Sequence, residues 1–310
     1  MPTVCERLPS GARVAVIRLR SLGDCVLSTP ALQLLKQARP DLEIGVVAED
    51  AFAAVFAGNP DVSRVLPPHS VDIVRWRPKL VLNLHGGARS ARLTLASRAA
   101  FRAGFDHFRF RPLYNVRIPT AQRILGVDRK VHTAEHVASA MFHLGVPVGE
   151  VPRARLFAAP RRWHRPYAVL HPFASVPAKT WSSENFRTLA RFVEEHLGLE
   201  PVFVAGPGES LGEFRPWRCV AGVDLEDTKS LLAGASLFAG NDSGPAHMAA
   251  ALGLPCLVLF GASDPEVWGP WKTPARVLHS PEINAITPSQ AAETVQQLAK
   301  EASFSPLQLR

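Results

Sequence analysis

Short apolar runs alternate with longer stretches of mixed polarity along the whole chain. The runs have the length and composition of strands buried on both faces, whereas the longer stretches repeat apolar residues at the helical interval. This alternation predicts an α/β protein with parallel sheets that helices cover on both faces. The predicted strands are 13–18, 43–48, 79–84, 167–171, 201–205, 236–240 and 256–260, and the predicted helices are 30–38, 89–99, 134–144, 184–196, 227–233, 245–252 and 289–301.

A stretch without periodicity interrupts this alternation near the middle of the chain. It contains Pro160 and Pro166, with the sequence Arg-Arg-Trp over 161–163 between them. We expect a linker over 158–166 and therefore two domains, 1–158 and 159–310. The helix predicted at the C-terminal end belongs to the second domain, and the sequence leaves open whether it packs back on the first.

Polar and glycine-containing loops follow several of the predicted strands. Open parallel sheets bind ligands beyond the carboxyl ends of their strands, so these loops are the candidate functional regions. We expect one crevice to collect the loops 20–24, 85–90, 172–182, 206–209, 241–244 and 261–264.

Charge is distributed unevenly along the chain. The formal net charge is +8, with +10 over residues 1–158 and −2 over residues 159–310. A basic first half predicts contact with an anionic partner such as a phosphorylated lipid, a membrane surface or nucleic acid. The sequence has neither zinc-finger spacing nor an aromatic-rich RNA-binding pattern, which disfavours nucleic acid. A generally arginine-rich surface is the alternative explanation.

The cysteines and the apolar stretches indicate a cytoplasmic protein. Cys5, Cys25, Cys219 and Cys256 lack the spacing of a metal site and are typical of reduced thiols. The first residues, MPTVCERLPSGAR, lack the apolar segment of a signal peptide. The long apolar stretch 245–262 is broken by His, Gly and Pro, so it predicts a helix followed by a strand rather than a membrane span.

The segment 240–271, GNDSGPAHMAAALGLPCLVLFGASDPEVWGPW, is the most informative part of the chain. A polar turn precedes Pro245, which suits the first turn of a helix because its missing N–H costs nothing there. Free N–H groups at such a helix start, with a hydroxyl from Ser243 and little side-chain bulk, form an anion site. An ordinary strand–helix unit with a polar turn is the alternative.

A second region near the N-terminus has a similar plan. A predicted strand is followed by RSLGDCVLSTPALQLL over 20–35, and NLHGGARS follows a later strand over 83–90. With the motifs N-D-S-G-P-A-H, A-A-L-G-L-P, F-G-A-S-D-P and W-G-P of the first region, this pattern resembles glycosyltransferase family 9, the ADP-heptose:lipopolysaccharide heptosyltransferases. The likeness spans most of 13–275 and is weakest over 107–165.

This resemblance implies a GT-B architecture, in which two Rossmann-like domains face a central cleft. It also implies an inverting glycosyltransferase that moves a heptose from ADP-heptose to a lipopolysaccharide-core-type acceptor, an anionic glycolipid or oligosaccharide. Such an enzyme would bind a nucleotide sugar, need no cofactor and no nucleic acid, and contact the inner membrane surface peripherally. The alternatives are a transferase with another nucleotide sugar or acceptor, a sugar-nucleotide epimerase or hydrolase, and a non-catalytic glycolipid-binding protein.

Asp24 is the candidate general base. An aspartate is ordinarily ionised at neutral pH, and it can take the proton of an acceptor hydroxyl as the bond to the sugar forms. The family's catalytic aspartate sits in the same Gly-Asp pair, whose glycine here is Gly23. Helix N-capping is the alternative role. Pro30 argues against it, because a helix that begins at Asp24 would place proline beyond its first turn.

Protein groups must stabilise the donor diphosphate, because the chain has no D-x-D triplet of the kind that holds a metal ion. We therefore expect metal-independent transfer that relies on cations and helix N-termini. Lys179, which is close to a tryptophan as in the family, is the candidate phosphate cation, and Ser175 is a candidate hydroxyl donor. The resemblance implies that Glu209 holds the ribose and that Gly206 makes room. A solvated lysine and a surface turn are the alternatives.

Four further residues complete the expected donor site: Asp242, Ser243, Gly244 and His247. Asp242 can accept hydrogen bonds from sugar hydroxyls, and Ser243 and the Gly244 N–H can face phosphate. His247 lies one turn into the predicted helix, on the side of the loop. An N-cap role for Asp242 and a core position for His247 are the alternatives.

The acceptor site is expected to use arginine, which binds phosphate or carboxylate with forked geometry. Arg20 and Gly23 in the first loop and Arg89 at the start of a predicted helix are the candidates. A solvated helix face is the more ordinary explanation for the neighbouring Arg92 and Arg98.

Overall fold

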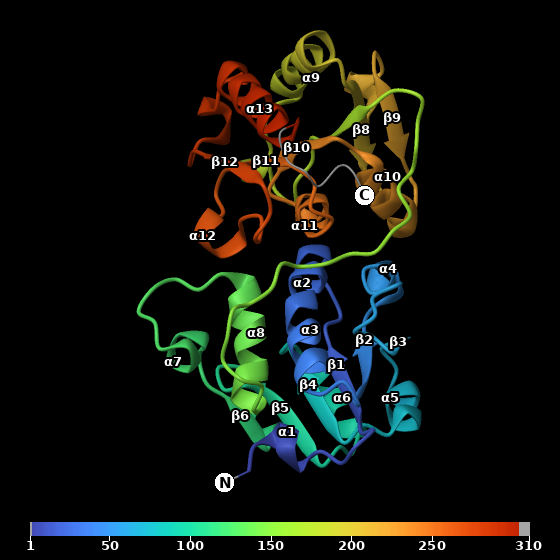
Figure 1. Ribbon diagram of the computed structural model, residues 1–310, viewed down its shortest axis with the longest axis vertical. Coiled ribbons are helices and arrows are strands. Elements are labelled where there is room, and N and C mark those ends of the chain that lie inside the picture. Colours follow the sequence, from blue (N-terminus) through green and yellow to red (C-terminus); the bar gives the residue numbers. More distant parts are fainter. Residues whose placement is uncertain (1, 304–310) are drawn as a thin grey trace. The chain divides into compact units, whose positions relative to one another are not determined.

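The computed structural model describes residues 2–303 and divides the chain into two compact units, Met1–Leu156 and Phe157–Arg310 (Figure 1). Each unit contains one six-stranded sheet in which every pair of neighbouring strands is parallel. The predicted α/β class with two Rossmann-like units is therefore confirmed.

The two sheets share one topology. The first contains β1 (Arg13–Ile17), β2 (Glu43–Val47), β3 (Arg64–Leu66), β4 (Leu80–Asn83), β5 (Phe101–Phe105) and β6 (Val116–Ile118). The second contains β7 (Tyr167–His171), β8 (Glu200–Ala205), β9 (Arg218–Ala221), β10 (Leu237–Asn241), β11 (Cys256–Phe260) and β12 (Ala275–His279). The strand orders are β3-β2-β1-β4-β5-β6 and β9-β8-β7-β10-β11-β12. The direction of chain progression therefore reverses between β1 and β4 and between β7 and β10, and ligands bind at such switch points.

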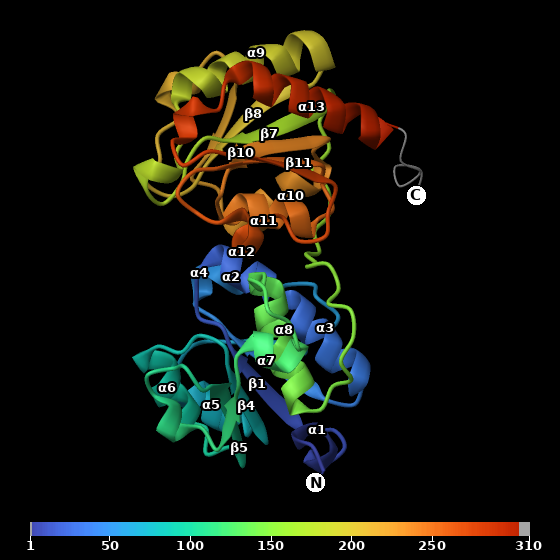
Figure 2. The ribbon, with the colours of Figure 1, turned by 90° about the vertical axis from the view of Figure 1, so that its left-hand side faces the viewer.

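Helices cover both faces of each sheet (Figure 2). In the first unit, α5 and α6 lie on one face and α3 and α8 on the other, whereas in the second unit α9 and α13 lie opposite α10 and α11. The helices are α1 (Val4–Arg7), α2 (Leu22–Leu27), α3 (Thr29–Ala38), α4 (Asp50–Ala53), α5 (Ser70–Trp76), α6 (Ala88–Ala96), α7 (Ala121–Leu125), α8 (Thr133–Leu144), α9 (Ser183–Leu197), α10 (Leu225–Gly234), α11 (Gly244–Ala251), α12 (Pro265–Trp268) and α13 (Pro288–Ser303). Short 3-10 turns lie at Arg111–Leu113, Pro177–Lys179, Gly212–Phe214 and Ile283–Ala285.

Apolar spacing explains how these elements pack. In α9, Phe186, Leu189, Ala190 and Val193 recur at helical intervals and are fully buried in the core of the second unit. The Ser182 hydroxyl begins this helix by accepting a hydrogen bond from a backbone N–H of the first turn. The C-terminal helix α13 contacts α9, β11 and β12, so its main packing partners belong to the second unit.

The two units meet between Leu156 and Phe157, just before the expected linker 158–166, in which the Arg161 N–H donates to the Ser230 carbonyl. Two parts of the sequence prediction need correction. Residues 22–24, expected in a loop, form the start of α2. The strands β3, β5, β6, β9 and β12 were not predicted, because they are short or carry arginine, glycine or exposed positions.

No helix within the described part of the chain is long and apolar enough to cross a bilayer. This finding agrees with the interpretation of 245–262 as a helix followed by a strand, since α11 and β11 occupy that stretch.

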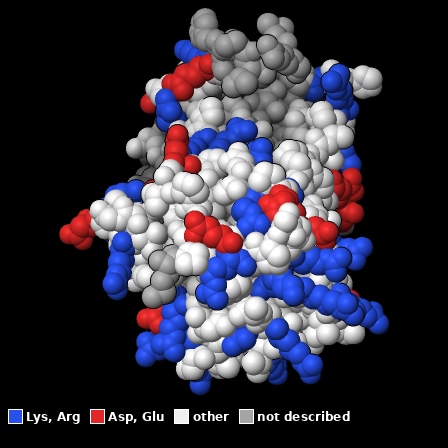
Figure 3. Space-filling model, turned by 60° about the horizontal axis from the view of Figure 1, so that its bottom comes forward, with Lys and Arg blue, Asp and Glu red and all other residues white. Residues whose placement is uncertain are grey.

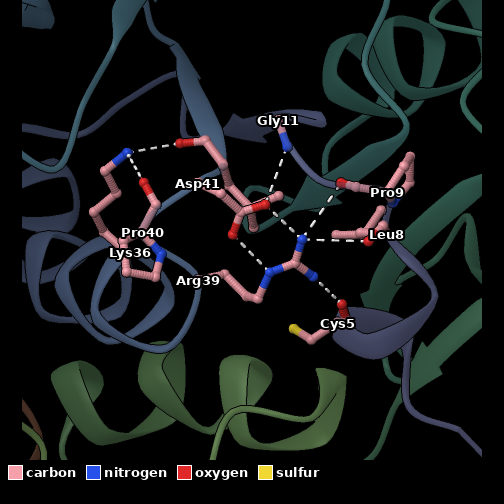
Figure 4. Close-up of polar contacts among 9 residues, drawn as sticks. Cys5, Leu8, Pro9, Gly11, Lys36, Arg39, Pro40 and Asp41 are labelled. Carbon is pink, nitrogen blue, oxygen red and sulfur yellow. Dashed lines mark hydrogen bonds and ion pairs between the residues drawn. The ribbon is translucent and has the colours of Figure 1, made fainter.

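Arg39 ties the N-terminal segment to the turn before β2 (Figure 4). Its guanidinium donates to the carbonyls of Cys5, Leu8 and Pro9, and it makes a forked contact with the Asp41 carboxylate at 2.8 and 2.7 Å. This hydrogen bond from Arg39 holds the pKa of Asp41 well below its ordinary value. One ion pair therefore fixes α1 and the following loop against the first sheet.

We expect Asp41→Asn to lower the melting temperature at neutral pH, because the Arg39 guanidinium loses its charged partner. A carboxylate whose pKa is lower in the folded state stabilises that state above the unfolded pKa of about 4, and this stabilisation is lost as the pH falls further. The difference in melting temperature between wild type and Asp41→Asn should therefore shrink between about pH 5 and pH 2. Calorimetry across this range checks the prediction, with the exposed Asp128→Asn as control. A difference that is independent of pH would contradict it.

Candidate functional site

The carboxyl end of the second sheet gathers most of the expected donor residues. Asn241 ends β10 at the switch point and is fully buried. Its side-chain oxygen accepts from the Trp181 N–H at 3.1 Å, and its side-chain nitrogen donates to the Pro172 carbonyl at 2.9 Å. Asn241 therefore fixes both ends of the loop that follows β7, and with it the position of Lys179.

Lys179 and Asp242 meet although 63 positions separate them in the chain. The Lys179 Nζ lies 2.9 Å from Asp242 Oδ2, and Ser263 Oγ donates to the same oxygen at 2.5 Å. The Asp242 side chain is 7 % exposed and the Lys179 side chain 27 % exposed. Three loops, after β7, β10 and β11, thus place one ammonium and one buried carboxylate at a single point.

A second contact group in the same unit centres on His171, the last residue of β7. Its Nδ1 lies 3.2 Å from Ser243 Oγ, and its Nε2 lies 3.7 Å from Glu209 Oε2. The Gly206 N–H donates to that Glu209 oxygen at 2.6 Å. Burial tends to raise the pKa of Glu209, but the His171 and Gly206 hydrogen bonds outweigh it and lower the pKa below its ordinary value. Glu209 therefore presents an ionised carboxylate, which can accept hydrogen bonds from hydroxyl groups.

The remaining donor candidates lie around the start of α11. Gly244 is its first residue, and no hydrogen bond from the Ser243 side chain caps the first turn. These N–H groups therefore keep the capacity to bind an anion. His247 is 6 % exposed, and its Nε2 is 4.0 Å from Asp242 Oδ1. Ser175 lies exposed in the loop after β7.

Gly261 explains why the loops after β7 and β11 can approach so closely. A Cβ atom at this position would lie 2.1 Å from the Ala178 carbonyl oxygen, which is backbone and cannot simply rotate away. That carbonyl accepts a hydrogen bond from the Ala262 N–H. The absence of a side chain at Gly261 therefore allows Ser263 to reach the oxygen that also binds Lys179.

We expect Gly261→Ala to push the Lys179 loop away and, if the donor is the expected ADP-sugar, to weaken binding of ADP about tenfold, with a lower melting temperature. Titration calorimetry with ADP and thermal unfolding measure the two effects. Gly149→Ala is the matched control, because a Cβ atom there meets nothing within 4 Å. Wild-type affinity in Gly261→Ala would show that this close approach does not position the donor residues.

In the first unit, Asp24 occupies the first turn of α2 at the switch-point end of the sheet. Its Oδ1 accepts from Arg18 Nη2 at 2.8 Å, and its Oδ2 accepts from Ser21 Oγ at 3.1 Å. Arg18 is 8 % exposed and also donates to the Leu84 carbonyl at 2.7 Å. The Asp24 side chain remains 25 % exposed. The structure therefore gives Asp24 a fixed orientation through a buried arginine together with access to solvent.

The loop after β4 is built around Asn83, which is fully buried. The Asn83 side-chain oxygen accepts from the N–H groups of His85 and Gly86, and its nitrogen donates to Ser90, Thr94 and Tyr114, among other contacts. Asn83 thereby fixes the path of the chain into α6.

The His85 ring lies close to the Asp24 segment. Burial lowers the pKa of His85, and the charges of Arg18 and Arg20 lower it further, while a hydrogen bond with the Arg20 backbone and the charge of Asp24 oppose them. The ring is therefore neutral at pH 7, beside the expected acceptor loop.

The acceptor candidates Arg20, Gly23 and Arg89 differ in burial and in ion pairing. Gly23 is buried in α2 beside Asp24, and Arg20 is exposed just before this helix. The guanidinium of Arg89 is already paired, since its Nη1 lies 3.0 Å from Glu49 Oε1 and its Nη2 donates to the Pro68 carbonyl. Their contact with an acceptor stays a prediction.

Sequence reasoning missed four residues that position this chemistry: Arg18, His171, Asn241 and Ser263. His171 and Asn241 are the last residues of β7 and β10, Arg18 directly follows β1, and Ser263 lies three residues after β11. A polar residue at the end of an apolar run is the signal that could have found the first three. Within residues 2–303, no three His, Cys, Asp or Glu side chains cluster in a way that could hold a metal ion.

Comparisons with known proteins show the family of the chain. Residues 77–299 match the model of glycosyltransferase family 9 (heptosyltransferase). Lipopolysaccharide heptosyltransferase 1 of Pseudomonas aeruginosa is 29 % identical over 83 % of this chain and 81 % of its own length, and the enzyme of that name from Salmonella typhimurium is 27 % identical over 88 % and 95 %.

Solved structures share the fold. The ADP-heptose lipopolysaccharide heptosyltransferase II of Escherichia coli superposes with a TM-score of 0.80 at 21 % identity, covering 94 % of this chain and 99 % of that one. The family match extends over well more than half of the residues and includes every donor-side element described above. The chain is therefore a glycosyltransferase that belongs to family 9, the heptosyltransferase family.

Proposed function

We propose that this enzyme transfers a heptose from ADP-heptose to a lipopolysaccharide-core-type acceptor, with inversion at the anomeric carbon and without a metal ion. The observation that carries the proposal is the meeting of Lys179, Asp242 and Ser263 at the switch point of the second sheet. The names of the relatives, lipopolysaccharide heptosyltransferases, support the sugar and the acceptor, and the structural neighbour is named for ADP-heptose.

The second unit would bind the donor. The diphosphate would lie at the start of α11, where first-turn N–H groups are available, and would draw Lys179 as its counter-charge. Asp242 and His247 would then face the sugar hydroxyls. A leaving diphosphate whose charge grows during the reaction is stabilised by such fixed cations and dipoles.

Glu209 would hold the nucleoside. Its lowered pKa keeps it ionised at neutral pH, so that it can accept hydrogen bonds from both ribose hydroxyls. The His171 ring, which contacts Glu209 and Ser243, would keep the ribose and phosphate ends of this site in register.

The first unit would supply the base. Asp24, oriented by Arg18 and Ser21, would take the proton of the acceptor hydroxyl as its oxygen attacks the anomeric carbon. The bond from that carbon to the donor phosphate oxygen breaks, and its electron pair leaves with ADP. A single in-line displacement of this kind inverts the anomeric centre.

Acceptor-dependent release of ADP tests the proposal. The chain is incubated with ADP-heptose, with and without a lipopolysaccharide-core acceptor, in the presence and absence of a chelator. We expect release only with acceptor, an inverted glycosidic bond by NMR, and no effect of the chelator. Release without acceptor would favour a hydrolase, retained donor binding without turnover would favour a non-catalytic glycolipid-binding protein, and loss of activity with chelator would contradict metal independence.

A further inference from the structure

The outward face of the helices α5 and α6 carries exposed aliphatic side chains. The two helices contact each other on one face of the first sheet (Figure 2). Val71 and Val74 on α5 are 52 % and 45 % exposed, and Leu95 on α6 is 55 % exposed. These are three of the six large hydrophobic side chains that are exposed among residues 2–303, so exposed apolar surface is concentrated on this helix pair.

These aliphatic side chains are not a misplaced part of the core. On α5 the buried side chains are Ile73 and Trp76, and on α6 they include Leu93. These side chains form the core-facing side of each helix. Val71 and Val74 are three positions apart and Leu95 follows Arg92 by three, so each pair lies on one side of its helix. The helices therefore have a buried face and a separate apolar, exposed face.

Arginine surrounds this apolar face. Arg75, Arg77, Arg92 and Arg98 are all exposed, and Asp72, which is half-buried, is the one acidic residue within α5 and α6. Residues 1–158 carry a formal net charge of +10, and lysine and arginine side chains outnumber acidic ones in the lower half of the view in Figure 3. Arg77 and Arg98 adopt positive φ values of 51° and 52° after the two helices, where glycine is the usual residue.

We propose that this helix pair, which we call the α5–α6 face, docks on the surface of an anionic lipid bilayer. The inference rests on the proposed function in that a lipid-anchored acceptor requires the enzyme to work at a membrane. An interfacial lipid layer satisfies both features of the face at once, since guanidinium groups pair with anionic headgroups while aliphatic side chains enter the acyl boundary. A nucleic acid would use the arginines but leave the aliphatic groups in water, and base stacking needs aromatic side chains that this face does not present.

The position of α6 links the face to the expected acceptor site. α6 begins directly after the His85–Gly87 loop, whose charged neighbours include Arg18 and Asp24. The carboxyl end of the first sheet, where the acceptor is expected, therefore borders the first turn of α6, whereas Leu95 and Arg98 lie toward the other end of this helix.

Vesicle flotation with the full chain tests the proposal without requiring activity. We expect binding to vesicles of phosphatidylcholine mixed with phosphatidylglycerol, little binding to phosphatidylcholine alone, and weakening by salt. The triple variants Val71→Ser/Val74→Ser/Leu95→Ser and Arg75→Gln/Arg92→Gln/Arg98→Gln should each bind the mixed vesicles about tenfold more weakly or worse. Val148→Ser/Val277→Ser, which changes two exposed valines elsewhere, is the matched control. Thermal unfolding confirms that each variant is folded.

Two outcomes would overturn the proposal: equal vesicle binding by wild type and both triple variants, or binding to a single-stranded oligonucleotide with none to the mixed vesicles. Activity provides a second measurement. The triple variants should lose kcat/KM on acceptor embedded in mixed vesicles but keep it on a deacylated acceptor in free solution. A chain that binds the mixed vesicles through this face yet transfers no heptose would refute the proposed function and leave the docking surface standing.

Discussion

Replacing Asp24 with asparagine is expected to reduce turnover by about 10²- to 10⁴-fold while leaving ADP binding unchanged. Asparagine keeps the size of the side chain. Its oxygen can still accept from Arg18, and its NH2 group can donate to the Ser21 hydroxyl in place of the bond that the carboxylate accepts, so the local geometry is retained. The asparagine amide cannot act as a base, so it cannot take the proton of the attacking hydroxyl group. We propose that residues of the other unit bind ADP, and affinity for ADP should therefore not respond.

Single-turnover assays and ADP titration measure the two quantities for Asp24→Asn. Asp106→Asn is the control, because Asp106 is also a carboxylate of the first unit near an arginine, with Oδ2 3.9 Å from Arg111 Nη1. The melting temperatures should show that both variants are folded. An Asp24→Asn enzyme with wild-type turnover would remove this carboxylate from the chemistry.

Replacing Lys179 with alanine is expected to weaken ADP binding by roughly 1.5–3 kcal/mol, about 10- to 150-fold, as for loss of a hydrogen bond to a charged group. The effect has two parts. The diphosphate loses its ammonium partner, and the Asp242 carboxylate, with a side chain only 7 % exposed, is left without that neutralising charge close to the bound anion.

A double-mutant cycle separates these two parts. If Asp242 repels the diphosphate once Lys179 is gone, Lys179→Ala/Asp242→Asn should bind ADP more tightly than Lys179→Ala alone. Lys179→Arg tests whether a cation at this point is sufficient, and Lys300→Ala, on the exposed side of α13, is the control for net charge. A loss of affinity no larger than that of Lys300→Ala would make Lys179 a solvated loop residue.

The apolar pattern alone determined the centre of each sheet. β1, β2, β4, β7, β8, β10 and β11 are continuous apolar runs because helices cover them on both faces, and that burial leaves a mark on the sequence. The edge strands β3, β6, β9 and β12 leave a weaker mark. They are short or half-exposed, and their pairing with a neighbour decides their conformation.

The helix α2 is a second case in which tertiary contacts, and not the local sequence, decide the conformation. Its sequence LGDCVL contains a glycine and is followed closely by Pro30, so local propensity favours a loop. In the structure Cys25, Val26 and Leu27 are buried, and α3 begins at Thr29 with the proline in its first turn. Packing of these apolar side chains outweighs the weak local preference, and it places Asp24 on a helix.

The motifs identified individual candidates such as Asp24, Lys179 and Asp242, but not the contacts among them. Lys179 meets Asp242 because β7 and β10 are neighbours, and His171 joins Ser243 to Glu209 because β8 lies on the other side of β7. Strand order and register arise from pairing between distant segments, and no local pattern encodes them. Sequence determined which residues could perform the chemistry, whereas tertiary structure decided which charges neutralise one another before any ligand arrives.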